Sequence, residues 1–134
     1  MLTIYGTLYS KKNSKQIVTR GRFPALISSK AYLQNVAPMQ AQLMAAENKA
    51  IWKEMIKGKP LPYKIHFTIY RKTERKWDYV NMIQGLLDEM QSSGYIADDD
   101  YAHVIPFFAE TALCRDNPRV EIRLIKSIDY ELCD

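Results

Sequence analysis

The chain has few cysteines and no long apolar run, and each absence excludes a class of protein. Cys114 and Cys133 are the only cysteines among 134 residues, and they fit no CxxC or metal-type spacing. We therefore expect free thiols, as in a reducing compartment, and not a disulfide framework. No stretch approaches the roughly 18 apolar residues that cross a bilayer, and the first ten residues do not resemble a secretory leader. The sequence predicts a cytoplasmic protein with no membrane partner.

The length fits one domain, and charge is spread unevenly along it. A chain of 134 residues is long enough to bury a hydrophobic core without disulfides or structural metal. We therefore expect a single domain over 1–134, with 127–134 as a tail. Residues 1–77 carry 15 Lys and Arg against 3 acidic residues, whereas residues 78–134 carry 4 against 12. This segregation indicates a basic surface for a polyanion beside an acidic pocket suited to cations. Mutual neutralisation of the two halves is the alternative.

The apolar pattern predicts an α+β domain in which one mixed sheet is covered by two main helices. Alternation of apolar and polar residues, rich in β-branched and aromatic types, predicts strands at 1–9 and 63–71. Two short strands, at 16–19 and 25–27, are expected to form a small hairpin.

Helical periodicity and turn residues predict the remaining elements. A helix is expected from residue 28 or 29 to about 55, kinked or divided at Pro38. Strands at 102–113 and 120–128 are expected to pair as a long antiparallel hairpin, because Asn and Pro in the link between them form turns. Pro106 predicts an edge position or a bulge for the first of these strands.

Residues 76–100 combine an amphipathic helix with an acidic run. On a helix over 78–92, the polar stripe contains a mid-helix glycine, Gly85, which costs about 1 kcal/mol relative to alanine. Either a ligand approaches the helix there, or the helix packs closely against a strand. Asp78 is also a plausible N-cap. The apolar side consists of Met82, Ile83, Leu86, Leu87 and Met90, and the polar stripe of Asp78, Asn81, Gly85, Asp88 and Ser92.

The acidic residues suit a divalent ion. A strand that ends in cations leads to Asp78 at the helix start, and three aspartates at 98–100 follow the helix. Mg²⁺ prefers carboxylate oxygens and keeps several waters. Phosphodiester hydrolysis uses a metal-activated water, and nearby lysines stabilise charge on the phosphate. The combination predicts a Mg²⁺ site, with Mn²⁺ as a substitute. An ordinary N-cap and an acidic turn are the simpler interpretation of each part.

Cations in and beside the loops are candidates for contacts to a phosphate backbone. Solvated loop side chains are the alternative for each of them. The set is Lys11, Lys12, Lys15, Arg71, Lys72, Arg75 and Lys76, with Asn13 as a further polar contact.

The runs DYVN and LLDEMQSSGYIADDD resemble the active-site segment of RusA-type Holliday-junction resolvases. That family shows an aspartate and an asparagine at a helix start, a further aspartate along the helix, a glycine followed by an aromatic residue, and then an aspartate pair. The segments KKNS and ISSKAYLQNV are also similar to the family, so the likeness covers about residues 1–126, although only 78–99 is specific. The matching residues are Asp78, Asn81, Asp88, Gly94, Tyr95, Asp98 and Asp99.

The resemblance implies a RusA-like fold and a homodimer that cleaves branched DNA with Mg²⁺, in recombination, repair or phage DNA processing. It implies Asp78 and Asp99 as metal-binding carboxylates, assisted by Asp98 or Asp88. It also implies that Asn81 positions a carboxylate or a metal-bound water.

The chain departs from the family pattern at Val80, where the family has its second aspartate, and at Gln84, where it has a catalytic lysine. Three interpretations remain open. Asp88, Asp98 or Asp100 completes the metal site, with Lys76 or Lys72 supplying charge. Alternatively, the protein binds junctions without cutting them, or it cuts a different structure. A small interaction domain that binds no nucleic acid is a further alternative.

Overall fold

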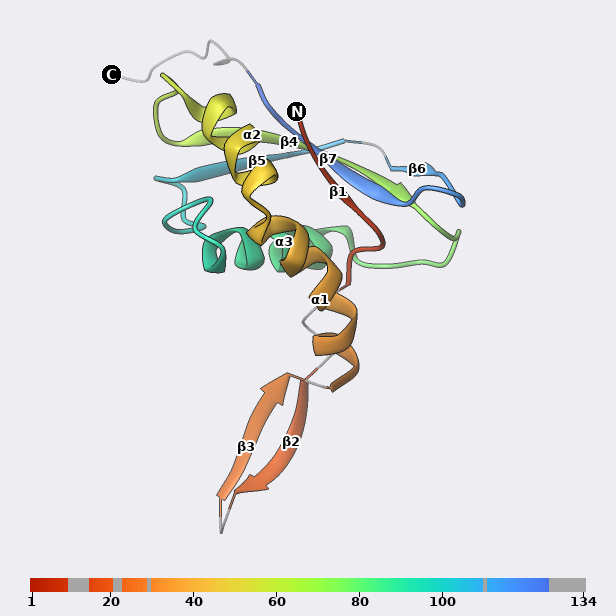
Figure 1. The fold of residues 1–134 in the computed structure, drawn as a ribbon. Helices are drawn as coiled ribbons and strands as arrows, with labels where there is room; N and C mark the ends of the chain where they lie inside the picture. Colours follow the sequence, from red (N-terminus) through yellow and green to blue (C-terminus); the bar gives the residue numbers. More distant parts are fainter. Residues whose placement is uncertain (10–14, 21–22, 29, 110, 126–134) are drawn as a thin grey trace, which may run out of the picture.

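Strand β4 (Tyr63–Arg71) is the centre of the fold. In the computed structural model, β4 pairs with three other strands. The structure describes residues 1–9, 15–20, 23–28, 30–109 and 111–125, and the side chains of 1–9, 33–109 and 111–125. Strand β4 is antiparallel to β7 (Arg119–Leu124) and parallel to β5 (Val104–Phe108) and the short β6 (Ala112–Leu113). The mixed sheet and the three helices in Figure 1 confirm the predicted α+β class. The predicted tail at 127–134 lies outside the described residues.

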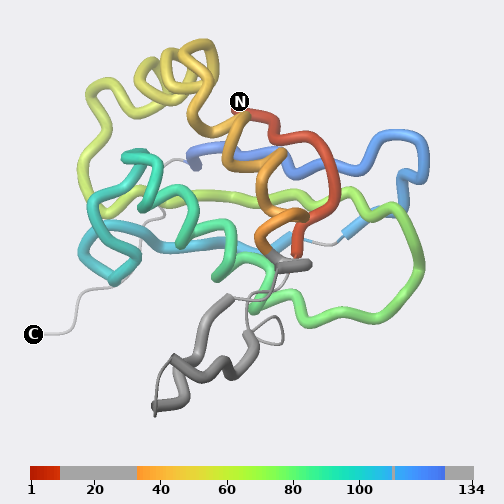
Figure 2. Tube along the Cα trace, turned by 60° about the horizontal axis from the view of Figure 1, so that its bottom comes forward, coloured from red at the N-terminus to blue at the C-terminus, as the bar shows by residue number. Residues whose placement is uncertain are grey.

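One face of the sheet carries the hydrophobic core. Strand β1 (Leu2–Tyr5) pairs with β7 at the sheet edge, so that Leu2 lies opposite Ile122. In β4, Ile65 and Phe67 are fully buried, because alternate residues of a strand point to the same face. Apolar residues of all three helices belong to the same buried cluster, so the helices cover this face. Figure 2 shows the first and third helices side by side.

The predicted pairing of the last two strands is wrong. Strand β4 lies between them, with Ile65 opposite Pro106 of β5 on one side and opposite Leu124 of β7 on the other. The turn near Asn117 does form, since its amide donates to the Cys114 carbonyl oxygen at 3.3 Å. A turn signal, however, does not identify the partner of a strand. The edge position predicted from Pro106 is confirmed, because β5 ends the sheet.

The predicted long helix is divided, but at Ala45 and not at Pro38. Helix α1 (Lys30–Met44) contains Pro38, and α2 (Ala46–Ile56) begins after Ala45, whose backbone is extended. The side-chain amide of Asn48 donates to the Gln42 carbonyl oxygen at 2.8 Å. The Ala45 backbone amide donates to the same oxygen at 3.2 Å, and together the two bonds satisfy a carbonyl at a helix end, which stabilises the break.

The second sheet is the predicted hairpin. Strands β2 (Lys15–Arg20) and β3 (Phe23–Ser28) pair antiparallel with each other. In the described part of the chain, no helix is long and apolar enough to cross a membrane.

The open face of the sheet carries a buried carboxylate between two arginines. Glu121 accepts hydrogen bonds from Arg119 at 3.2 Å and from Arg123 at 3.0 Å, and the Arg119 guanidinium lies 3.8 Å from the centre of the Tyr70 ring. Although burial raises the pKa of Glu121, the hydrogen bonds from Arg123 and Arg119 outweigh it and hold that pKa below the ordinary value.

Acid is therefore expected to weaken the fold through Glu121. A carboxylate with a lowered folded-state pKa stabilises the fold fully above its unfolded pKa, which is 4.5 for an ordinary Glu, and the contribution is lost as pH falls through the folded value. We expect the free energy of unfolding to fall more steeply below about pH 4.5 in the native chain than in Glu121→Gln. Urea denaturation at several pH values measures this, and parallel curves for the two proteins would contradict it.

Candidate functional site

Asp78 begins helix α3 (Tyr79–Ser92) as its N-cap, as the sequence predicts. Its carboxylate accepts from the Asn81 backbone amide at 3.2 Å and from the Asn81 side-chain amide at 2.9 Å. The first of these bonds satisfies a backbone amide that the helix start leaves without an intrahelical partner. In the structure, Asn81 therefore contacts the Asp78 carboxylate through both its backbone and its side-chain amide.

A second cluster centres on Gln84. Its side-chain nitrogen donates to an oxygen of Asp88 at 3.0 Å and to an oxygen of Asp99 at 2.7 Å. Two carboxylates from different segments therefore lie within hydrogen-bond reach of one neutral amide. The sequence named Gln84 only as a departure from a family pattern, and its bridging role was missed.

The three aspartates at 98–100 have different hydrogen-bond partners. Asp98 accepts from the Asp99 backbone amide at 2.7 Å, and Asp100 accepts from the Ala102 amide at 3.1 Å. Asp100 also contacts the His103 ring nitrogen at 2.5 Å, and this hydrogen bond holds the pKa of Asp100 below its ordinary value. These two side chains hold the local backbone, so within this run Asp99 is the aspartate that reaches across to α3.

The turn after α3 fixes the start of the acidic segment. Gly94 has φ of 84°, and the amides of Gly94 and Tyr95 donate to Gln91 and Met90 at 3.1 and 2.8 Å. This is a Schellman ending, which requires a residue in the left-handed region and so favours glycine. Tyr95 is buried, 5% exposed, and its position determines where the chain leaves the helix.

Trp52 of helix α2 holds this turn in place through contacts with Tyr95. The Trp52 indole nitrogen donates to the Tyr95 carbonyl oxygen at 2.9 Å, and the Tyr95 hydroxyl donates to the Leu43 carbonyl oxygen at 2.6 Å. The Trp52 ring also packs against Tyr63 and Tyr95, with centres 6.0 and 5.8 Å apart. No local sequence signal linked Trp52 to the acidic segment, because the contact joins residues 43 positions apart.

Gly85 has the structural explanation. It is buried on α3, and a Cβ added there would lie 3.3 Å from the Tyr9 carbonyl oxygen. The segment after β1 therefore packs directly on the helix backbone. The sequence left open a ligand or close packing against a strand; the structure shows close packing, but against the Tyr9 backbone of the segment after β1 and not against a strand.

The predicted cations on the β4 side gather around a cavity of about 450 Å³. Arg71 ends β4, and Lys72, Arg75 and Lys76 follow in the loop that leads to Asp78. Lys11, Lys12 and Asn13 lie outside the described residues, and Lys15 belongs to β2 but its side chain is not described.

The structure does not gather the predicted metal residues into one group. Asp78 pairs with Asn81, Asp99 with Gln84, and Asp98 with the backbone amide of Asp99. Among the described residues, no three His, Cys, Asp or Glu side chains are placed to hold a metal ion. Val80, where the resembled family has an aspartate, is 59% exposed.

The site therefore consists of two amide–carboxylate clusters along α3, with a cationic loop at the start of the helix. No protein-family model matches the chain, and no match was found among curated proteins.

Proposed function

We propose that the chain is a Mg²⁺-dependent endonuclease of the RusA-like class that cuts branched DNA, including Holliday junctions, as a homodimer. The observation that supports this most directly is the convergence of Asp88 and Asp99 on the Gln84 amide. An acidic pair built from two separate segments is what a divalent ion at a phosphodiester would need. The cationic loop ending at Asp78 supplies the complementary feature, a surface for phosphates.

The donor chemistry of this pair fits Mg²⁺. Mg²⁺ is usually held by one or two carboxylates together with waters and substrate phosphate oxygens, so a group of three protein ligands is not required. Asp99 and Asp88 would hold the ion, with Asp78 facing the same substrate from the start of the helix. The ion would activate a water and stabilise charge on the leaving oxygen.

Gln84 keeps the two carboxylates together without neutralising them. An amide donates hydrogen bonds but carries no charge, so Gln84 would hold Asp88 and Asp99 without adding a positive charge beside the ion. A lysine at this position would add a positive charge beside the phosphate. In this chain, Lys72 or Lys76 of the neighbouring loop, both exposed, would supply that charge.

Asn81 and the helix start position the remaining carboxylate. Because both oxygens of Asp78 accept from Asn81, the carboxylate is held in one orientation before substrate binds. Preorganised groups of this kind lower the barrier, since no reorientation is needed during the reaction.

A junction-binding protein without nuclease activity is the second candidate. The exposed Val80 and the neutral Gln84 favour it, because both replace charged groups of the resembled family. Its phosphate contacts would involve the same loop cations.

A synthetic four-way junction titrated with Mg²⁺ or Mn²⁺ separates these functions. We expect metal-dependent cleavage by the native chain, and no product from Asp78→Asn with junction affinity nearly unchanged. Asparagine is as good an N-cap as aspartate, so this variant preserves the helix start. Equal cleavage by Asp78→Asn would remove Asp78 from the site. Binding without product under every metal condition supports the junction-binding protein, and absent or salt-insensitive binding supports a domain that does not use phosphate contacts.

A further inference from the structure

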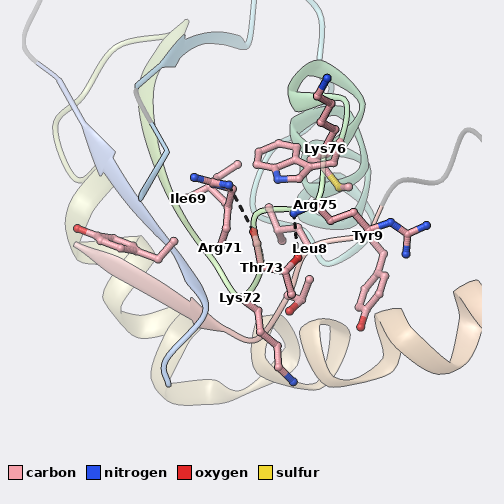
Figure 3. A pocket seen from close by; sticks show the side chains of 12 residues that line it. Leu8, Tyr9, Ile69, Arg71, Lys72, Thr73, Arg75 and Lys76 are labelled. Atoms are coloured by element: carbon pink, nitrogen blue, oxygen red, sulfur yellow. Dashed lines mark hydrogen bonds between the residues drawn. The ribbon is translucent and has the colours of Figure 1, made fainter. Parts of the chain in front are cut away.

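The cavity beside the start of α3 has an apolar interior and a cationic rim. Its volume of about 450 Å³ lies within the range of about 300–1,000 Å³ typical of small-molecule sites. The aromatic ring of Trp77 forms part of the wall directly before Asp78. Figure 3 shows Lys72 and Lys76 extending at opposite ends of the view. The apolar part of the lining is Leu8, Ile69, Trp77 and Met82, and the cations are Arg71, Lys72, Arg75 and Lys76.

The cations of the rim are available to a ligand. Within the described residues, no carboxylate lines the cavity, and none of these four cations takes part in an ion pair. A concave surface lined by cations and low-dielectric walls concentrates anions. The cavity therefore favours a ligand that carries negative charge.

Arg71, which lines this cavity, contains a buried donor without a partner among the described residues. Its terminal nitrogen donates to the Thr73 carbonyl oxygen at 3.3 Å (Figure 3), whereas its buried Nε has no hydrogen-bond partner in the described part of the chain. Buried donors are nearly always paired, and leaving one unpaired is costly. If the Arg71 side chain turned toward the cavity on binding, an acceptor oxygen of the ligand would satisfy this donor.

We propose that this cavity binds an unpaired nucleotide of a DNA strand, its base against the apolar wall and its phosphates against the rim. The proposal rests on the proposed function and adds a preference for single-stranded segments near the cut. A free phosphate would leave the apolar wall exposed to water, and an apolar ligand would leave the cations unused. A base within a duplex is stacked and paired, so an unpaired base is the form that can enter an aromatic-lined pocket.

Filling the cavity tests the proposal. Thr7 is exposed and lines the cavity, and Thr7→Trp adds bulk there without removing a cation. We expect this variant to bind a fluorescent eight-nucleotide oligothymidylate about tenfold more weakly, the loss expected when one base no longer stacks. Its affinity for a duplex of equal length should change less than twofold. Ser92→Trp is the matched control, since Ser92 is exposed at the far end of α3 and does not line the cavity.

Fluorescence anisotropy in EDTA at low salt gives both affinities without metal or cleavage. Four outcomes would overturn the proposal. Thr7→Trp could bind the oligonucleotide as tightly as the native chain, or lose equal affinity for both DNAs. Ser92→Trp could lose as much affinity as Thr7→Trp, or the native chain could fail to bind the oligonucleotide. Junction cleavage in Mg²⁺ is assayed separately. Selective loss in Thr7→Trp together with no cleavage by the native chain would reject the proposed nuclease and retain the nucleotide site. If the native chain cleaved junctions but Thr7→Trp bound the oligonucleotide as tightly as the native chain, the nuclease would be retained and the nucleotide site rejected.

Discussion

Asp99→Asn is expected to slow junction cleavage at saturating Mg²⁺ by at least about 100-fold, since a metal ion contributes several kcal/mol of transition-state stabilisation and about 1.4 kcal/mol corresponds to tenfold. Asp99 connects the acidic run to α3, because its carboxylate accepts a hydrogen bond from Gln84 at 2.7 Å. Asparagine keeps the size of the side chain and removes its charge, so we expect junction affinity to stay within about twofold, as the phosphate contacts remain. Single-turnover cleavage of a labelled junction, with binding measured in EDTA, gives both quantities.

Asp100→Asn is the matched control for this substitution. It removes the same charge one residue away, from a side chain that contacts His103 and the Ala102 amide and makes no described contact with α3. We expect the control to cleave at nearly the native rate. Equal losses in the two variants would indicate a general effect of the acidic run on the metal and would contradict a specific role for Asp99.

Trp52→Ala is expected to lower the free energy of unfolding by about 3–5 kcal/mol, the usual cost of removing a buried aromatic side chain. Trp52 is 4% exposed, and its ring packs against those of Tyr63 and Tyr95. The substitution leaves a cavity beneath the turn that leads to the acidic run, and it removes the donor to the Tyr95 carbonyl oxygen. Urea denaturation followed by circular dichroism measures the loss.

Trp52→Phe separates packing from hydrogen bonding at this position. Phenylalanine keeps an aromatic ring and removes the indole nitrogen, so we expect a smaller loss, near the cost of about 1–3 kcal/mol for leaving a buried acceptor unsatisfied. If both variants lost the same amount, the hydrogen bond and not the packing would be the main contribution. If neither lost stability, Trp52 would not anchor the turn.

Local sequence signals predicted the elements that depend on neighbouring residues. The alternation of Ile65, Phe67 and Ile69 predicted the central strand, and all three are buried. The N-cap at Asp78 was predicted for the same reason, since capping joins residues within one turn. The small hairpin likewise depended on two short strands and the loop between them.

Features that join distant residues were not predicted. The sequence suggested that the last two strands pair with each other, but β4 lies between them, because alternation reveals the buried face of a strand and not its neighbour. The break at Ala45 depends on Asn48 and Gln42, whereas the sequence pointed to Pro38. In the site, the bridging of Asp88 and Asp99 by Gln84 depends on how the chain returns after α3.

The parallel pairing of β4 with β5 ties the acidic site to the edge of the sheet. Asp99 lies in the link between α3 and β5. Strand β5 is at the edge of the sheet, where it is hydrogen-bonded to β4. Edge strands with few partners belong to the parts of a protein that open locally before the whole fold is lost. Opening of β5 would release the tether on this link, so the site can be lost in a chain that is still largely folded. Retention of bulk structure is therefore a weaker measure of an intact site here than protection of the β5 amides from hydrogen exchange.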